Sequence, residues 1–441
     1  MTVTVALFTR DLRVHDNPML RAACHEGAGV VPLFVLDDRI IAREPVSPNR
    51  IRFLLTALSE LDDELHALDG RLVIRRGDVL DEVDKVVAHT HAESVHIAAD
   101  VSWYSRERER LLRERLARRD CLLHAHDDSV TVAKPGDPSP ASGRGHFAVF
   151  TPYFRRWMET PVRRPLAPPP RFVVPPLRGA ELPRPQELCA EPGSPQMSAG
   201  GETSGRKLMK QWLSGPIHEY DSMSDDLASD ATSHLSPYLH FGCVSATELV
   251  HRTDTSTPGG HAFVRQLAWR DFHHQLLADR PEAGWTDYRR APAGWRDDPD
   301  AVEAWRSGRT GYPVIDAAMR QLVAEGWMPG RARLIVAAFL TKTLRIDWRI
   351  GAAHFRRWLI DADVANNQLN WQWAAGTGTD TRPNRVLNPL RQAERHDPDG
   401  EYVRRWLPEL AQLSGASVHT PWRSGIPHSV YPAPIVEVNG M

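Results

Sequence analysis

Three hydroxyl side chains gather within five residues, at Thr232, Ser233 and Ser236, just before Pro237. Hydroxyls and backbone N–H groups at the start of a helix are good ligands for phosphate. A single Ser or Thr in such a position is more often an ordinary helix N-cap. The residue types therefore allow a phosphate site or a cap, and on these residues alone the cap is favoured.

Tryptophan is the second group with chemical potential. Twelve of the 14 tryptophans lie at or after Trp212. A single tryptophan usually fills core space, because a large aromatic ring is most stable when buried. A helical segment this rich in tryptophan can also line a large aromatic pocket, so the set needs an explanation that its single members do not.

The elements that must position these residues begin with an α/β pattern over the first 130 residues. Short apolar runs suited to buried parallel strands occur at 3–8, 30–36, 71–75, 94–98 and 121–125. Helical stretches lie between them, at 50–68 with one apolar face and at 102–118 with a charged one. We expect a doubly wound parallel sheet. It has neither a G-x-G-x-x-G nor a P-loop motif, so a dinucleotide bound in the usual way is not indicated there.

The rest of the chain divides by composition. Residues 161–195 hold 11 of the 35 prolines and are expected to form neither regular helix nor central strand. From about Gly205 the pattern is helical almost throughout. We therefore expect an α/β domain at 1–130, a Pro-rich connector at 131–204, an all-α domain at 205–425 and a tail at 426–441.

The bulk numbers point to a soluble protein. Hydrophobic residues make up 41% and charged residues 25% of the chain, and no run of about 18 apolar residues predicts a membrane span. The first ten residues resemble a buried strand more than a signal peptide. The four cysteines form no C-x-x-C pair, which predicts no metal site, no disulfide framework and a cytoplasmic location. The net charge of −2 does not by itself indicate a nucleic-acid binder, although a mean can hide a local patch.

Several stretches together resemble the DNA photolyase/cryptochrome family, in order and with similar spacing over nearly the whole chain. They are LFTRDLRVHDNPML (7–20), TSHLSPYLHFG (232–242), RQLAWRDFHHQ (265–275), GYPVIDAAMRQL (311–322), GWMPGRARL (326–334), DADVANNQLNWQWAAGTGTD (361–380) and NRVLNP (384–389). The likeness is greatest to class I cyclobutane pyrimidine dimer photolyases of actinobacterial type. It implies FAD in the helical domain, dimer-containing DNA as substrate and a monomer that does not enter membranes.

The resemblance also implies a set of FAD ligands, and it reverses the preference for a simple cap at the hydroxyl cluster. The implied ligands are Tyr220, Thr232, Ser233, Leu235, Ser236, Arg270, Arg333, Asp361, Asp363 and Asn367. Within this set Arg333 and Asp361 correspond to an ion pair beside the flavin. Asn367 corresponds to the amide that faces flavin N5, where it tunes which redox state persists.

Electron transfer and substrate binding are implied in the same way. Trp295, Trp348 and Trp371 match a chain of tryptophans that carries electrons from the surface to the flavin. Five further residues match those that hold the flipped lesion or the DNA phosphates: Gln266, Trp269, Arg331, Trp373 and Arg385. Tyr220 also matches a residue of this lesion pocket.

This sequence departs from the pattern of repair enzymes at four places. Gln266 replaces a glutamate that hydrogen-bonds the dimer, Pro329-Gly330 replaces His-Asn, Leu334 replaces a methionine, and His234 replaces an arginine. These changes affect the expectation of repair more than the expectation of flavin binding.

The family's N-terminal domain often holds an antenna chromophore. Asp100, after the fourth predicted strand, and the actinobacterial likeness favour 8-hydroxy-5-deazaflavin, with folate or no antenna as alternatives. Phe34, Arg50 and His240 are further candidates for this site, although each is equally well explained as a structural residue.

The expected activity is light-driven splitting of cyclobutane pyrimidine dimers by an electron from excited reduced FAD. A cryptochrome-like photosensor without repair is the main alternative. A (6-4) photolyase is disfavoured, because Pro329-Gly330 stands where a histidine acid would be needed. A nucleotide-binding N-terminal domain beside an incidental helical domain is the weakest alternative.

Overall fold

A computed structural model describes residues 2–41, 46–291 and 294–438. Its N-terminal domain is built on a five-stranded sheet in the order β3-β2-β1-β4-β5, with every neighbouring pair parallel. The strands are β1 (Val3–Leu7), β2 (Gly29–Asp37), β3 (Val73–Gly77), β4 (Ser94–Ala98) and β5 (Leu122–His126). The doubly wound α/β fold is thereby confirmed, with strand ends within two residues of those expected.

Helices cover both faces of the sheet. On one face lie α1 (Pro18–Glu26) and α3 (Pro48–His66), and on the other lie α4 (Val79–Thr90) and α5 (Trp103–Ala117). Alternate residues of each strand serve the two faces: Ala6 packs with α1 and α3, whereas Val5 and Leu7 pack with α4 and α5. A short helix, α2 (Asp38–Ile41), follows β2.

The segment between the domains is more structured than a bare linker. It contains α6 (Phe150–Glu159), whose Phe150, Tyr153 and Trp157 pack against the helical domain, and one short turn of helix, α7 (Pro185–Leu188). The proline-rich stretch runs along the sheet domain, where the N–H of Val30 donates to the carbonyl of Val173 at 2.9 Å. The domain boundaries expected from composition remain predictions.

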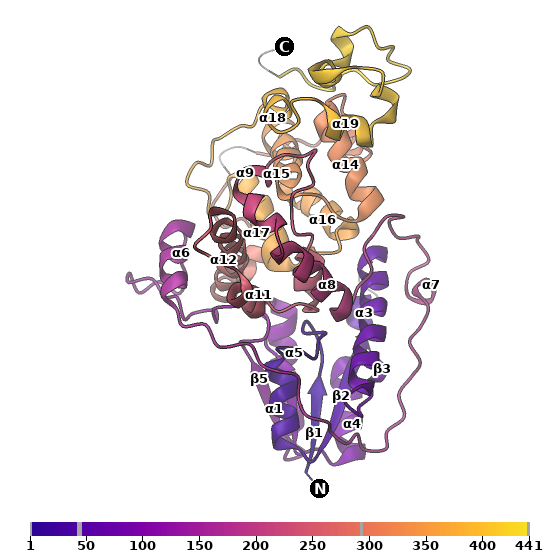
Figure 1. The fold of residues 1–441 in the computed structure, drawn as a ribbon, viewed down its shortest axis with the longest axis vertical. Coiled ribbons are helices and arrows are strands. Elements are labelled where there is room, and N and C mark those ends of the chain that lie inside the picture. Colours follow the sequence, from indigo (N-terminus) through magenta and orange to yellow (C-terminus); the bar gives the residue numbers. More distant parts are fainter. Residues whose placement is uncertain (1, 42–45, 292–293, 439–441) are drawn as a thin grey trace.

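The helical domain follows, as expected. Its helices are α8 (Glu202–Leu213), α9 (Tyr220–Met223), α10 (Ser236–Phe241), α11 (Ala246–Arg252), α12 (Pro258–Asp279), α13 (Pro299–Arg306), α14 (Pro313–Glu325), α15 (Gly330–Ala338), α16 (Trp348–Trp358), α17 (Val364–Ala375), α18 (Pro389–His396) and α19 (Glu401–Trp406). Figure 1 shows this domain above the end of the sheet that is opposite the N-terminus. No helix in the described residues is long and apolar enough to cross a membrane.

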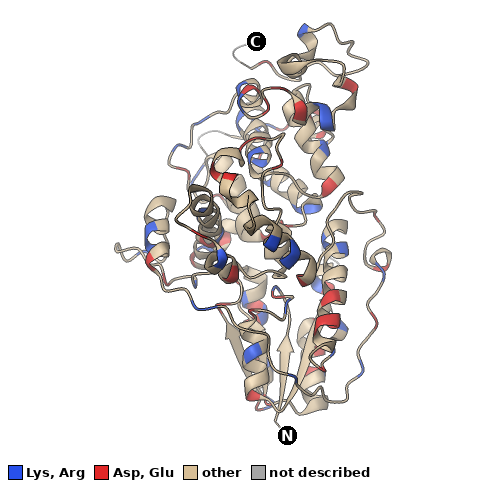
Figure 2. Cartoon of the chain, in the orientation of Figure 1, with Lys and Arg blue, Asp and Glu red and all other residues tan. Residues whose placement is uncertain are grey.

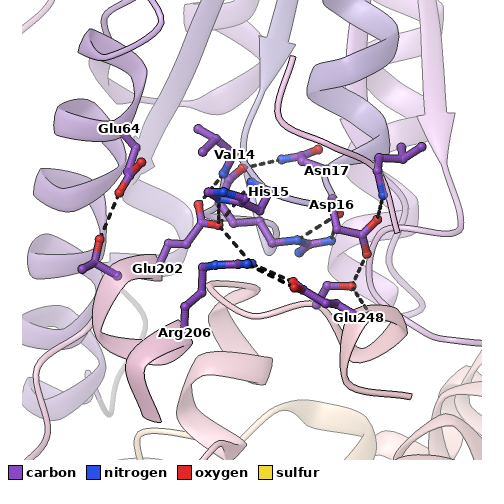
Figure 3. Close-up of polar contacts among 12 residues, drawn as sticks. Val14, His15, Asp16, Asn17, Glu64, Glu202, Arg206 and Glu248 are labelled. Atoms are coloured by element: carbon purple, nitrogen blue, oxygen red, sulfur yellow. Dashed lines mark hydrogen bonds and ion pairs between the residues drawn. The ribbon is translucent and has the colours of Figure 1, made fainter. Parts of the chain in front are cut away.

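A polar network ties the loop after β1 to the helical domain (Figure 3). The buried carboxylate of Glu202 in α8 accepts from the N–H of Val14 at 2.6 Å and contacts the ring of His15 at 2.7 Å. Arg206, one turn along α8, donates to both carboxylate oxygens of Glu248 at 2.6 and 3.1 Å. Because these groups are buried or half-buried and paired, they fix how the two domains meet.

Candidate functional site

A cavity of about 550 Å³ opens among the helices of the C-terminal domain. Its wall contains every residue expected to bind FAD, all but one of those expected to bind DNA, and Trp371 of the tryptophan chain. These are Tyr220, Thr232, Ser233, Leu235, Ser236, Gln266, Trp269, Arg270, Arg331, Arg333, Asp361, Asp363, Asn367, Trp371 and Trp373. Residues scattered over more than 150 positions of sequence therefore converge on one space large enough for a cofactor and part of a substrate.

The hydroxyl cluster lies at one end of this cavity and does not cap a helix. The N-cap position of α10 is Leu235, and no side chain caps it. Ser236 accepts a hydrogen bond from the indole N–H of Trp327 at 3.2 Å, and Ser233 accepts one from the N–H of Leu235 at 3.3 Å. The hydroxyl of Thr232 is buried and has no hydrogen-bond partner among the described residues. A buried hydroxyl without a partner is costly, so this end of the cavity fits a ligand with acceptor oxygens.

Two carboxylates lie along the cavity wall, each beside a cation. Asp361 takes two hydrogen bonds from Arg333, at 2.9 and 2.8 Å. Asp363 is the N-cap of α17, where it accepts from the N–H of Asn366 at 2.8 Å, and its carboxylate lies 4.0 Å from Arg10. Burial favours the neutral acid, but the nearby His274 and Arg10 outweigh it and hold the pKa of Asp363 well below its usual range. Asp363 is therefore an anion ready to accept N–H or O–H donors.

Asn367 faces the cavity from the first turns of α17. Its amide nitrogen is already engaged, donating to the carbonyl of Ala352 at 3.1 Å and to Gln368 at 2.8 Å. No described residue donates a hydrogen bond to its carbonyl oxygen. The oxygen is therefore the atom that remains to accept a ligand N–H.

Arg270 is held from outside the helical domain. Its guanidinium donates to the carbonyl of Val130 at 2.7 Å and lies 3.5 Å from the carboxylate of Asp271. Burial lowers its pKa, although Asp271 acts in the opposite direction. The α12 face that carries Arg270 is thereby fixed against the chain that follows β5.

The three tryptophans of the expected chain lie in or against one hydrophobic core. Trp371 lines the cavity, Trp348 is fully buried in the same core, and Trp295 is half-buried and packs against it. The ring of Trp371 lies over Gly351, one turn after Trp348 in α16, so closely that a Cβ on Gly351 would come within 2.2 Å of it. The indole N–H of Trp348 donates to Asp287 at 2.9 Å, whereas that of Trp371 has no partner among the described residues.

The residues expected to bind the lesion lie in the more exposed part of the cavity wall, here called its mouth, where Gln266 is exposed and Trp269 and Trp373 are half-buried. Trp269 stacks on Phe150 of α6 with ring centroids 3.7 Å apart, so one of its faces is covered by protein. Arg385 does not line the cavity, but it is exposed and its guanidinium lies 6.0 Å from the ring centre of Trp373. Arg331 is paired with Asp225. Figure 2 shows that cationic and anionic residues are interspersed along the ribbon of both domains, so any attraction for DNA depends on local groups such as these.

The sequence departures also lie at this cavity. Gly330 and Leu334 line it, and a Cβ added to Gly330 would meet no other atom within 4 Å. His234 stacks on Trp327 with ring centroids 3.8 Å apart and its Nε2 lies 2.7 Å from Asp230. The space beside Gly330 is thus open, and the position of His234 is filled by aromatic stacking.

The four antenna candidates divide into separate environments. Asp100 and the carbonyl of His240 both bind Arg10, at 3.1 and 3.2 Å, and the cation helps to lower the pKa of Asp100 to about 2 despite its burial. Arg50 donates to the carbonyls of Arg356 and Leu359, and Phe34 is part of the sheet core. Of the four, His240 alone lines the large cavity.

Sequence reasoning missed several residues of this site, and periodicity could have found most of them. On α12, Gln266, Trp269, Arg270 and His273 are spaced at i, i+3, i+4 and i+7, and all four line the cavity. On α17 the same spacing adds Asn366 and Asn370 to Asn367 and Trp371. Arg10 was also missed, because nothing in the sequence says that the turn after β1 reaches Asp363.

Comparison with known proteins gives consistent matches. Residues 4–171 match the family model described as DNA photolyase, and residues 263–441 match the FAD binding domain of DNA photolyase. A deoxyribodipyrimidine photo-lyase from Streptomyces griseus is 55% identical, over 99% of this chain and 97% of its own length.

Two solved structures are similar over nearly the whole chain. An archaeal photolyase from Sulfolobus tokodaii, which contains two FAD molecules, superposes with a TM-score of 0.84 at 32% identity, covering 99% of this chain and 96% of the other. A cryptochrome from Synechocystis sp. superposes with a TM-score of 0.91 at 29% identity, with the same coverage.

Proposed function

Because this chain belongs to the DNA photolyase family, we propose that it repairs cyclobutane pyrimidine dimers in DNA with the energy of light, as a deoxyribodipyrimidine photo-lyase. The observation that carries the proposal is the single cavity whose inner wall holds Asp361, Asp363 and Asn367 and whose mouth holds Trp269 and Trp373. One space thus offers ligands for a flavin and aromatic walls for a flipped pyrimidine dimer.

The cavity residues fit FAD. The unpartnered Thr232 hydroxyl and its neighbours suit a diphosphate, and the anionic Asp363 suits ribose or ring donors. The free carbonyl oxygen of Asn367 suits an N–H of a reduced flavin ring. When bound and reduced, FAD supplies the light absorption and the transferable electron. The protein supplies placement, exclusion of water and tuning by these hydrogen bonds.

Trp371, Trp348 and Trp295 are proposed to carry electrons toward this cavity. Their shared core and the contact of Trp371 with the α16 turn after Trp348 support the proposal. Of the three tryptophans, Trp371 is the one that lines the cavity, and its indole N–H has no partner among the described residues. We therefore place Trp371 nearest to the flavin.

DNA is proposed to lie across the mouth. Trp269 and Trp373 would stack on the lesion, Gln266 would hydrogen-bond its edge, and Arg331 and Arg385 would contact flanking phosphates. Gln266 is exposed at the rim, where its amide can both donate and accept.

We also propose an antenna, 8-hydroxy-5-deazaflavin before folate, near Asp100 and His240. The second FAD of the Sulfolobus tokodaii photolyase, interpreted there as a light-harvesting cofactor, supports an antenna in general but not this chemical choice. We further propose that the protein acts as a monomer in the cytoplasm. Free thiols are typical of that reducing compartment, and the described cysteines are all free thiols.

The test is light-dependent loss of cyclobutane dimers from an oligonucleotide incubated with the fully reduced, flavin-loaded protein. The alternative, a photosensor without repair, is not favoured by the relatives at 55% and 34% identity, which are named deoxyribodipyrimidine photo-lyase. It would be chosen if flavin is bound and reduced and no dimer is lost under illumination. Loss of (6-4) products instead of dimers would point to the remaining alternative.

A further inference from the structure

A cluster of ligating side chains lies in the α/β domain, apart from the cavity. We propose that Glu26, His96 and His124 form a site for a divalent metal ion of the zinc type. One ligand atom from each of the three lies within 4.8 Å of the others. None of the three lines the cavity described above, so the proposal is independent of the repair function.

The strand register builds this cluster. His96 of β4 is paired directly with His124 of the edge strand β5, so both rings stand on the same face of the sheet. This is the face covered by α1, because Ser94 and His96 are in register with Thr4 and Ala6, and the Thr4 hydroxyl donates to Ala23 of α1. Glu26 is the last residue of α1. The carboxylate of Glu26, at the end of α1, therefore lies next to the imidazoles of both His96 and His124.

The distances are close to those of a metal site. Nε2 of His96 lies 3.2 Å from the carboxylate of Glu26, and Nε2 of His124 lies 3.9 Å from it. Ligand atoms of a tetrahedral zinc ion with bonds of about 2.0–2.1 Å are about 3.3 Å apart. Small rotations of two partly exposed side chains, Glu26 at 40% and His124 at 41%, would close the remaining gap.

A neighbouring histidine, His126, can orient the ring of His96 by a hydrogen bond, as the outer partners of metal-binding histidines do. Nδ1 of the buried His96 lies 3.0 Å from Nε2 of His126. When Nδ1–H donates to His126, the lone pair of His96 is on Nε2, the atom that faces Glu26.

Two imidazoles and one carboxylate are a donor set that suits zinc and its borderline neighbours and does not suit magnesium or calcium, which prefer oxygen alone. Such a three-ligand site leaves room for water. Because the ligands come from α1, β4 and β5, a bound ion would join the helix end to the edge of the sheet. The sequence predicted no metal site because that prediction rested on the spacing of the cysteines, whereas these ligands are a glutamate and two histidines on three separate elements.

The experiment is calorimetric titration of the chelator-treated, FAD-loaded full chain with zinc chloride at neutral pH. We expect one zinc ion per chain, no binding of magnesium chloride, and a higher melting temperature with zinc. His124→Ala and Glu26→Gln should each abolish that binding. His126→Ala should weaken it about 10-fold or more, as loss of an orienting partner does.

His89→Ala, which removes an exposed histidine from α4 of the same domain, is the matched control and should bind as the wild type does. Circular dichroism and retained flavin show that each variant is folded. The proposal is overturned if the wild type binds no zinc, or if His124→Ala and Glu26→Gln bind it as tightly as His89→Ala.

Discussion

Arg333 forms a bidentate ion pair with Asp361, in which Nη1 donates to Oδ1 at 2.9 Å and Nη2 donates to Oδ2 at 2.8 Å. The third donor of the guanidinium, Nε, reaches the carbonyl of Met328 at 2.9 Å. The carboxylate of Asp361 is nearly buried, whereas the arginine is about one-quarter exposed, with 27% of its side chain accessible. This pair therefore fixes α15 against the turn that carries Asp363, and both sides of that junction line the cavity.

Arg333→Lys should weaken FAD binding. Lysine keeps the charge but cannot form the paired hydrogen bonds, each of which is worth about 1.5–3 kcal/mol when a charged group takes part. Loss of one such bond corresponds to about 10- to 100-fold weaker retention of the cofactor. Dialysis followed by fluorescence of the released FAD measures it.

Arg320→Lys is the matched control, since Arg320 forms a similar half-buried pair with Glu409 outside the cavity. Equal FAD retention in the two variants would contradict a role for Arg333 at the cofactor.

Trp371→Phe should slow the light-driven reduction of oxidised FAD without loss of bound flavin. Phenylalanine fills most of the space over Gly351, and the substitution breaks no described hydrogen bond, because the indole N–H of Trp371 has no partner there. Absorbance of FAD under blue light with an external reductant measures the rate. Trp285→Phe, at an exposed tryptophan outside the expected chain, should leave the rate unchanged. An unaltered rate in Trp371→Phe would mean that electrons arrive by another route.

Local pattern predicted the elements well, and the reason is that burial imposes a period on the sequence. The apolar runs marked all five strands, and the helical spacing on α12 and α17 marks the part of the cavity wall that these two helices form. The helix α6 was overlooked, although Phe150, Tyr153 and Trp157 have helical spacing, because proline content alone defined the connector.

Contacts between distant segments could not be predicted from pattern. Arg10 reaches Asp100 and Asp363 because the turn after β1 meets the helical domain, and this depends on how two domains pack. The pairing of Arg333 with Asp361 came from family resemblance, not from spacing. The Glu26–His96–His124 cluster depends on strand order and register, which periodicity does not give.

Arg385→Ala and Arg331→Ala should weaken DNA binding about equally for damaged and undamaged strands. Removing one cationic partner of a phosphate should lower the salt slope of binding by about one. Asp225→Asn should act in the opposite direction, because it removes the anion that pairs with Arg331 at the mouth. Fluorescence anisotropy at several salt concentrations measures all three.

Arg113→Ala, at an exposed arginine of α5, serves as the control for charge alone. If Arg385→Ala affects damaged DNA only, that residue reads the lesion and does not contact phosphate.

Acid should destabilise the flavin domain through its buried histidines. Burial lowers the pKa of His240 to about 3 and those of His273 and His274 to about 4, against about 6.5 in the unfolded chain. Between the folded and the unfolded pKa values, the unfolded chain binds protons that the folded chain does not. The free energy of unfolding is therefore highest above about pH 6.5 and falls as the pH drops toward 4. Each histidine contributes at most about 1.4 kcal/mol per pH unit.

His273→Gln isolates this effect, because glutamine can still donate to Asn366, the partner of His273 at 3.1 Å. Urea unfolding between pH 7 and pH 5 should show a shallower loss of stability in this variant than in the wild type. His428→Gln, at an exposed histidine, should follow the wild type. Identical slopes in all three proteins would show that His273 is protonated as easily when folded as when unfolded.

Gly330→Asn, alone or with Pro329→His, should raise dimer repair. The structure leaves no atom within 4 Å of a Cβ at Gly330, and the residue lines the cavity, so an asparagine amide can enter without displacing a neighbour. One recovered neutral hydrogen bond is worth about 1 kcal/mol, or about fivefold in affinity for the dimer. Gln266→Glu, which restores a charged acceptor at the rim, should add a similar factor. The measurement is the rate of light-dependent dimer loss with reduced, flavin-loaded protein and limiting DNA.

Gly330→Leu is the matched control for this prediction, because leucine fills the same space without an amide. Stacking on Trp269 and Trp373, worth about 1–3 kcal/mol per base, and phosphate contacts remain in every variant, so the wild type should already repair dimers at a measurable rate. A gain in Gly330→Asn that Gly330→Leu does not share would assign the effect to the hydrogen bond. Equal gains would assign it to the filled volume. If neither the wild type nor Gly330→Asn repairs dimers while flavin is bound and reduced, the missing amide is not the cause, and the chain is a sensor rather than a repair enzyme.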